Sequence, residues 1–225
     1  WGDIQWGTMA GAFAATSNLE LETIDTPDLS SVNSMKNMFR ASGISATDSE
    51  ITSWDVSNVV DMSFMFRNAK FFNGDISKWS VSNVTDMEGA FQYSSNFDKE
   101  ISSWDVSSVK NMDSMFELAE SFNQKINQWD VSSVTSMESM FLGASSFNQD
   151  LGQWDVSNVE NMSAMFNGAT SFNGNIGKWD VSSVSDMANM FSSASSFNQD
   201  IGQWNVSNVK HMFDMFREPR HLTKI

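Results

Sequence analysis

The chain has 225 residues, and its 18 Phe, 9 Trp and 16 Met stand against 2 Pro and no Cys. This much aromatic and thioether surface can fill a sizeable core, which excludes wholesale disorder. The absence of Cys excludes a disulfide scaffold, a thiolate metal site and a cysteine nucleophile. Thirteen Lys and Arg against 28 Asp and Glu give a net charge of -15, which argues against nucleic acid or an anionic membrane as the main partner.

The chain begins at Trp1, with neither an initiator Met nor a signal peptide. We therefore expect a processed form or a segment of a longer protein. No run approaches 18 apolar residues, so the sequence predicts no transmembrane segment.

Tryptophans recur along the chain at a strict spacing of 25 residues, and the same text returns around each of them. It reads Ile-x-x-Trp-Asp-Val-Ser-Asn/Ser-Val, then Met-x-x-Met-Phe, then Ala-x-x-Phe-Asn. A fixed period of this length is typical of a repeat array, in which stacked units bury a face that one unit alone cannot bury. The tryptophans in this register are Trp54, Trp79, Trp104, Trp129, Trp154, Trp179 and Trp204.

The first units are irregular. Residues 9–19 (MAGAFAATSNL) match residues 87–97 (MEGAFQYSSNF), which predicts a degenerate N-terminal coil or cap over residues 1–26. In the second coil, Phe39 lies 27 rather than 25 residues before Phe66. Terminal repeats are normally atypical, so both departures suit an N-terminal cap.

The apolar spacing changes character inside each regular unit. Trp54 and Val56 flank Asp55, which is the alternation of a strand. The apolar residues of 59–69 then fall at steps of three and four, which predicts one face of a short helix. We therefore predict an α/β repeat over residues 27–216, a right-handed solenoid of about nine coils, each with a short parallel strand and a short helix.

The last predicted helix is stopped by Pro219, and residues 217–225 form a basic tail. We expect this tail either to fold across the end of the stack or to meet a partner there, with a negatively charged partner favoured by its charge. The candidate residues for this end contact are Arg217, Arg220, Leu222 and Ile225.

The repeat resembles a leucine-rich repeat with its leucines replaced. It is most similar to the 25-residue repeat of the BspA-like leucine-rich-repeat surface proteins, which is also found in mycoplasmal surface lipoproteins, and the similarity covers roughly residues 27–218. The resemblance implies an extracellular, non-catalytic repeat domain used in adhesion or protein contacts. It names no ligand.

An acidic residue follows most of the tryptophans and points out of the predicted sheet. Such a row would attract a basic partner or hold Ca²⁺, which prefers several carboxylate and carbonyl oxygens. Because no calcium-binding signature accompanies the row, we expect each carboxylate to accept hydrogen bonds from nearby Ser or Asn and to keep the face soluble, with no bound metal. The row comprises Asp55, Asp105, Asp130, Asp155 and Asp180, with Ser80 and Asn205 in the other two units.

A second polar row follows the phenylalanine of the turn. One amide per unit at the same place predicts a ladder that bonds backbone groups left unpaired by the turn. The row comprises Asn73, Asp98, Asn123, Asn148, Asn173 and Asn198. The tryptophans share the inward side with the valines, so we predict that they belong to the core rather than to an exposed carbohydrate platform.

Apolar residues that depart from the repeat are candidates for a contact surface. Phe64, Phe71 and Phe213 stand where other units carry small or polar residues. Exposed aromatic residues mark contact surfaces, although single exposed phenylalanines are also common.

An enzymatic role is not expected. The histidines, His211 and His221, lie in the last unit and the tail, and neither a P-loop nor a dinucleotide-binding glycine pattern is present. A repeated carboxylate row offers no site unlike its neighbours, whereas catalysis needs groups with different pKa values. We thus expect no catalytic residue and no cofactor.

The sequence favours a non-catalytic adhesion or protein-interaction module, extracellular or at the cell surface, with a protein partner. The main alternative is a structural subunit of a larger assembly. Ice binding is disfavoured by the charge of the regular face, and polysaccharide binding lacks an exposed Trp.

Overall fold

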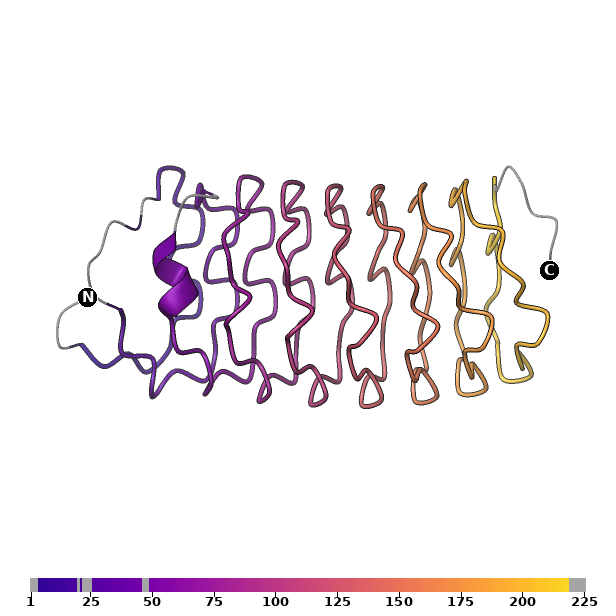
Figure 1. Cartoon of the computed structure of the whole chain (residues 1–225), viewed down its shortest axis with the longest axis horizontal. Helices are drawn as coiled ribbons and strands as arrows, with labels where there is room; N and C mark the ends of the chain where they lie inside the picture. Colours follow the sequence, from indigo (N-terminus) through magenta and orange to yellow (C-terminus); the bar gives the residue numbers. More distant parts are fainter. Residues whose placement is uncertain (1–3, 20, 22–25, 46–48, 219–225) are drawn as a thin grey trace.

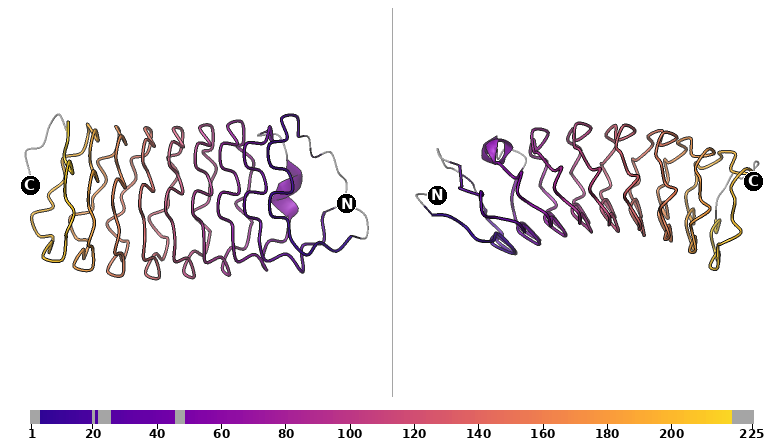
Figure 2. Two further views of the ribbon diagram at one scale, coloured as in Figure 1. Left: turned by 180° about the vertical axis from the view of Figure 1, so that it is seen from behind. Right: turned by 90° about the horizontal axis from the view of Figure 1, so that it is seen from below.

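The computed structural model describes residues 4–19, 21, 26–45 and 49–218. They form an elongated stack of irregular coils, with the early and late units at opposite ends (Figure 1). Seen from below, the stack is gently bowed (Figure 2). Successive coils lie in register, because isolated parallel bridges join residues 25 apart, from Asp61 with Asp86 to Asp186 with His211.

The predicted α/β fold is wrong. Among the described residues the only helix is a short 3-10 helix, η1 (Ser49–Ser53), visible as the coiled ribbon near the N-terminal end in Figure 1. The expected parallel strands are reduced to isolated bridges, and residues 59–69 are a succession of turns instead of a helix. The right-handed leucine-rich-repeat-like architecture of strand plus helix is therefore not the architecture of this chain.

The reason for the absence of helices is the backbone conformation of two residues in each unit. Phe64 and Asn68 have φ of 56° and 58°, in the left-handed region, whereas an α-helix needs φ near about -60°. Equivalent residues of the other units share this conformation, including Ser114 with Leu118 and Ala164 with Gly168. A residue in the left-handed region interrupts a right-handed helix, so the segment cannot propagate one.

The backbone N–H groups of these turns are satisfied alternately within and between coils. The N–H of Met65 donates to the carbonyl of Met62 at 3.2 Å, which closes a turn, and the N–H of Phe66 donates to the carbonyl of Ala90 in the next coil at 2.8 Å. The same alternation recurs in later units. Buried peptide groups are thus paired without regular strands or helices.

The tryptophans lie inside the stack, as predicted. Trp129 is only 3% exposed, and its indole N–H donates to the carbonyl of Ile101 at 3.1 Å. Each indole therefore fills the core and ties its coil to the preceding one. The same bond, always to the carbonyl 28 residues earlier, is made by Trp79, Trp104, Trp154, Trp179 and Trp204.

Phenylalanines form two parallel columns beside the tryptophans. In the first column, which includes Phe66 and Phe91, ring centroids of neighbouring coils lie 5.3 to 5.7 Å apart. In the second, which includes Phe72 and Phe97, the spacing is 5.8 to 6.0 Å. Stacking along both columns makes every inner coil depend on the coils on either side.

Candidate functional site

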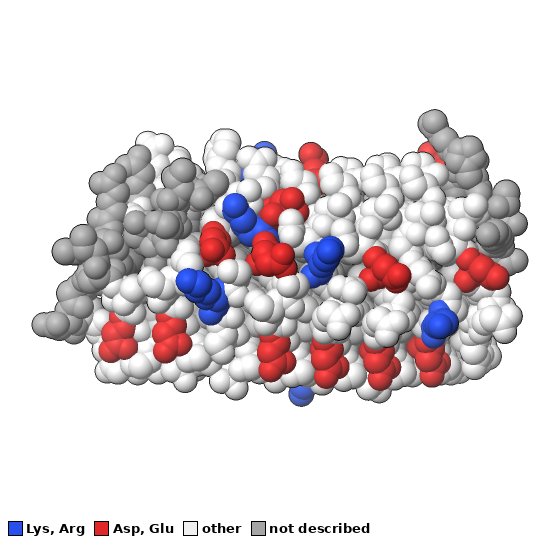
Figure 3. Space-filling model, in the orientation of Figure 1, with Lys and Arg blue, Asp and Glu red and all other residues white. Residues whose placement is uncertain are grey.

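The row of aspartates after the tryptophans is exposed, as predicted. In Asp130 the Oδ1 atom accepts hydrogen bonds from the N–H and the hydroxyl of Ser132, at 3.1 and 2.6 Å. Each carboxylate of the row bonds the N–H two residues later, so it fixes the turn that follows the tryptophan. Figure 3 shows a row of acidic side chains along the lower edge of the molecule.

Hydrogen bonding shifts the titration of several members of this row. The pKa of Asp55, Asp130 and Asp180 is lowered, first by the hydroxyl and then by the backbone N–H of the serine two residues later. These bonds favour the charged carboxylate. A lowered pKa in the folded state stabilises the fold above the unfolded-state pKa, and this stabilisation is lost as the pH falls through the folded-state pKa.

The shift predicts a pH-dependent mutational effect. Replacing Asp130 with Ala removes the acceptor of the turn, and we expect its destabilisation to be full at about pH 6 and to shrink as the pH falls below about 4. Asn205 makes the same turn bond to the N–H of Ser207 without a titrating group, so Asn205→Ala is the matched control. Urea unfolding at a series of pH values measures both effects. An Asp130→Ala effect as independent of pH as that of Asn205→Ala would contradict the assignment.

The second polar row bonds backbone groups between coils, as predicted. The side chain of Asn123 accepts a hydrogen bond from the N–H of Asn148 at 2.9 Å, and Asn123 in turn donates its own N–H to Asp98 at 2.9 Å. The carboxylate of Asp98 therefore takes the place of an amide without breaking the ladder. These side chains close the turns of the stack.

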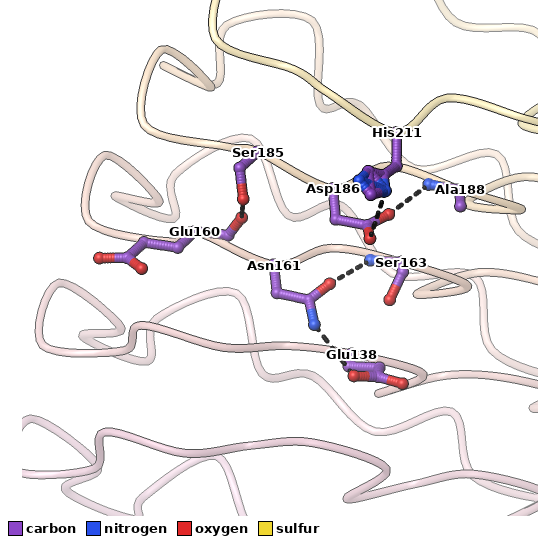
Figure 4. A network of polar contacts seen from close by, with 8 residues as sticks. All are labelled: Glu138, Glu160, Asn161, Ser163, Ser185, Asp186, Ala188 and His211. Carbon is purple, nitrogen blue, oxygen red and sulfur yellow. Dashed lines mark hydrogen bonds and ion pairs between the residues drawn. The ribbon is translucent and has the colours of Figure 1, made fainter.

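A third polar row was not predicted from the sequence. It occupies the position just before the first Met of each Met-x-x-Met-Phe segment and lies at the parallel bridges between coils. Figure 4 shows Asn161 accepting the N–H of Ser163 at 2.9 Å and donating to Glu138 at 2.9 Å. The recurrence of Asp, Asn or Ser at this position was the signal that could have revealed it.

The same network contains the histidine of the last described coil. His211 Nδ1 lies 3.7 Å from Asp186 Oδ2, while Asp186 Oδ1 accepts the N–H of Ala188 at 2.9 Å (Figure 4). The imidazole is 55% exposed, so this pair lies at the surface. Nothing in the described part of the chain sets three or more His, Cys, Asp or Glu side chains close enough to hold a metal ion.

The three aromatic candidates have different surroundings. Phe71 and Phe213 are 64% and 63% exposed. Phe64, which we expected at the surface, is half-buried. Two cations lie over its ring, with Lys36 Nζ 5.6 Å and the Arg67 guanidinium carbon 5.5 Å from its centroid.

The sequence analysis also did not predict a surface hollow near Phe64. It has a volume of about 290 Å³ and is lined by Arg40, Ala41, Arg67, Asn68 and Tyr93. The two arginines occupy equivalent positions in successive coils, where the next units carry Gln and Glu. A pair of cations at one repeat position was the available signal, and the irregular 27-residue spacing concealed it.

The structure describes one of the four residues predicted to form the end contact. Arg217 is exposed, and its guanidinium nitrogens lie 3.9 Å from Asp214 and 4.0 Å from Glu218. The other members of the predicted contact, Arg220, Leu222 and Ile225, lie outside the described residues. The division of the chain at residues 26 and 216 stays a prediction.

Comparison with known proteins supplies a family. The family described as "Mycoplasma protein of unknown function, DUF285" matches residues 7–98, 74–160 and 148–224. No curated protein matches the chain. Of the helices in the described residues, none has the length and apolar character needed to cross a membrane. The match agrees with the mycoplasmal part of the resemblance, but it does not extend to leucine-rich repeats. The chain belongs to the DUF285 family of mycoplasmal repeat proteins of unknown function.

Proposed function

We propose that the chain is a non-catalytic protein-binding module displayed at the outside of the cell. The observation that carries this proposal is the separation between the residues that recur and those that do not. The recurring apolar residues fill the core, and the recurring Asp and Asn residues bond the backbone of the turns. Residues that break the pattern, such as Phe71, Tyr93 and Phe213, lie at the surface. Large aromatic residues at a surface favour contacts with another protein.

The polar rows support a role in binding rather than catalysis. Their side chains repeat from coil to coil and are bonded to nearby backbone groups, so one member closely resembles the next. General acid and base chemistry needs two titrating groups with distinct pKa values.

An assembly subunit is the alternative, and one surface favours it. At the last described coil an apolar hollow is lined by Trp204, Val206, Met212, Met215 and neighbouring residues. Val206 and Met212 are each 42% exposed there, and Phe213 is more exposed still. An apolar end of a repeat array favours association with another subunit.

Two matched variants separate the two roles. The biotin-labelled wild-type chain is incubated with the surface proteins of intact cells, alongside Phe71→Ser and Phe213→Ser. A binding module that uses the Phe71 surface retains a partner at fixed stoichiometry, and Phe71→Ser retains at least about tenfold less, because a buried aromatic anchor carries much of an interface's energy.

The same material is examined for self-association and for exposure on cells. Loss of self-association in Phe213→Ser, with no partner lost in Phe71→Ser, would favour the assembly subunit. External protease is expected to cleave the chain on intact cells. A chain that resists protease until the cells are broken would contradict its display outside the cell.

A further inference from the structure

The hollow lined by Arg40, Arg67 and Tyr93 continues into a second one. The second hollow is lined by Ser17, Ser42, Gly43, Lys70 and Phe71, and it shares Ala41 and Asn68 with the first. We call the combined surface the basic groove, defined by Arg40, Arg67, Asn68, Lys70, Phe71 and Tyr93.

The groove is positive on a chain whose net charge is -15. Its two arginines lie at the same position of neighbouring coils, so their charges repel each other. Within the described residues, neither guanidinium forms an ion pair with an acidic side chain within 4.0 Å. An anion placed between the two arginines would relieve this repulsion.

Glu117 is the nearest acidic residue at the repeat position that Arg40 and Arg67 share, and its carboxylate already has other partners. Glu117 accepts a hydrogen bond from the Gln92 side chain, which lies in the coil between it and Arg67. Glu117 also bonds the Tyr93 hydroxyl, which raises the pKa of Tyr93. The carboxylate of Glu117 is therefore held by Gln92 and Tyr93. Arg67 lines the groove and also lies close enough to Glu88 for the two charges to attract each other.

The groove is held in place by the backbone of the stack. The N–H of Ala41 donates to the carbonyl of Arg67 at 2.7 Å, and the N–H of Asn68 donates to the carbonyl of Gln92 at 2.6 Å. The Arg67 guanidinium carbon lies over the ring of Phe64, 5.5 Å from the ring centroid, and this cation–π contact helps to hold the side chain in place. A prearranged site loses less conformational entropy when a ligand binds.

Phe64 and the groove residue Tyr93 share the positive φ that recurs at equivalent positions of the other units. Phe64 and Tyr93 have φ of 56° and 62°, a conformation that is unfavourable for bulky side chains. Further along the chain Leu118, Ser139 and Ala164 have the same positive φ at equivalent positions. Because this conformation recurs from unit to unit, it belongs to the repeat and does not single out the groove.

We infer that the basic groove binds an acidic segment of a partner protein. The Arg40 and Arg67 forks suit carboxylates, the Asn68 amide suits a peptide group, and Phe71 and Tyr93 offer apolar contact at the two ends. The buried Ser42 hydroxyl, which has no hydrogen-bond partner within the described structure, supplies a further polar group beside Phe71. This inference rests on the proposed function, because it names the chemistry of the protein partner.

A short peptide fits the distribution of charge better than a long polyanion does. The groove occupies the early coils, while the aspartate row and the net charge make the rest of the molecule acidic. A sulfated polysaccharide or an anionic membrane would extend beyond the groove and meet like charge. A peptide with a few carboxylates lies within the positive surface.

Fluorescence anisotropy with a short labelled peptide of alternating Glu and Phe tests the inference. Binding is expected to weaken as salt is raised, and the double variant Arg40→Gln/Arg67→Gln is expected to lose at least about tenfold in affinity. The double variant Lys125→Gln/Lys178→Gln changes the net charge equally at exposed sites away from the groove, and its affinity is expected to stay within about twofold. Arg40→Lys/Arg67→Lys keeps the charge but loses the planar guanidinium groups, so its affinity for the peptide should lie between those of the two glutamine variants.

Four results would overturn the inference. An equal loss of affinity in Arg40→Gln/Arg67→Gln and in Lys125→Gln/Lys178→Gln would show that net charge alone attracts the peptide. Equal binding of a peptide with Gln in place of Glu would exclude carboxylate recognition, and tighter binding of a sulfated oligosaccharide of equal charge would assign the groove to glycans. If the acidic peptide fails to bind while Phe71→Ser still loses a protein partner, the groove assignment falls and the proposed function stands.

Discussion

Replacing Trp129 with Ala is expected to lower the free energy of unfolding by about 3–5 kcal/mol. The indole is 3% exposed, lies 6.4 Å from the Phe116 ring and bonds the carbonyl of Ile101. Its removal leaves a cavity and takes one of two hydrogen bonds from the Ile101 carbonyl, which keeps the bond from the N–H of Trp104 at 3.1 Å. Because each coil is stabilised by its neighbours, amides of the adjacent coils should exchange with solvent sooner than those of distant coils.

Two variants separate the contributions to this effect. Trp129→Phe keeps an aromatic ring but removes the N–H, and we expect the lost hydrogen bond to cost about 0.5–1.5 kcal/mol, because the Ile101 carbonyl still accepts the N–H of Trp104. Phe71→Ala removes a ring that is 64% exposed and should change the stability by less than about 0.5 kcal/mol. Calorimetric melting and hydrogen exchange measure these effects. A Trp129→Ala variant as stable as Phe71→Ala would contradict the role of the indole.

The core could be predicted from the sequence because burial depends on residue type and repeat register. Val59, Met62 and Phe66 lie on the apolar face predicted for residues 59–69, and the structure buries all three. Their spacing of three and four residues is the spacing of a helix face, which led to the wrong secondary structure. Apolar spacing reports which residues point inward, and it does not report the sign of φ.

The left-handed residues carry little sequence signal of their own. Gly89 and Gly143 are of the type that favours positive φ, but Phe64, Leu118 and Ala164 adopt the same conformation. Bonds to the neighbouring coils hold these residues there, as the bond from Leu118 to Leu142 at 2.7 Å illustrates. A contact between residues 24 apart overrides the local preference, and local pattern alone does not contain it.

Only part of the candidate site could be predicted, because some of its residues come together only in the folded stack. The aspartate row recurs in the repeat and Phe71 departs from it, so comparison of the units found both. The basic groove combines Arg40, Arg67 and Tyr93 from three successive coils. Its members are separated by 27 and 26 residues, and only the folded stack brings them to one surface.

Ala164 offers a large test of the turn geometry. Its φ is 52°, and its N–H donates to the carbonyl of Ala188 in the next coil at 2.8 Å. Proline fixes φ near about -65° and has no N–H, so Ala164→Pro should lower the free energy of unfolding by more than about 3 kcal/mol. A loss below about 1 kcal/mol in urea unfolding would show that neither the φ nor the bond is as described.

The sign of the effect of Ala164→Gly tests the central claim most directly, namely that the Met-x-x-Met-Phe segments are left-handed turns bonded between coils. Glycine adopts positive φ without strain, so the variant should unfold at higher urea, with a gain of about 0.5–1 kcal/mol. Ala188 does not have positive φ, and Ala188→Gly, the control, should lose about 0.5–1 kcal/mol. In a helix both substitutions would destabilise, so a loss of about 1 kcal/mol in Ala164→Gly would contradict the account.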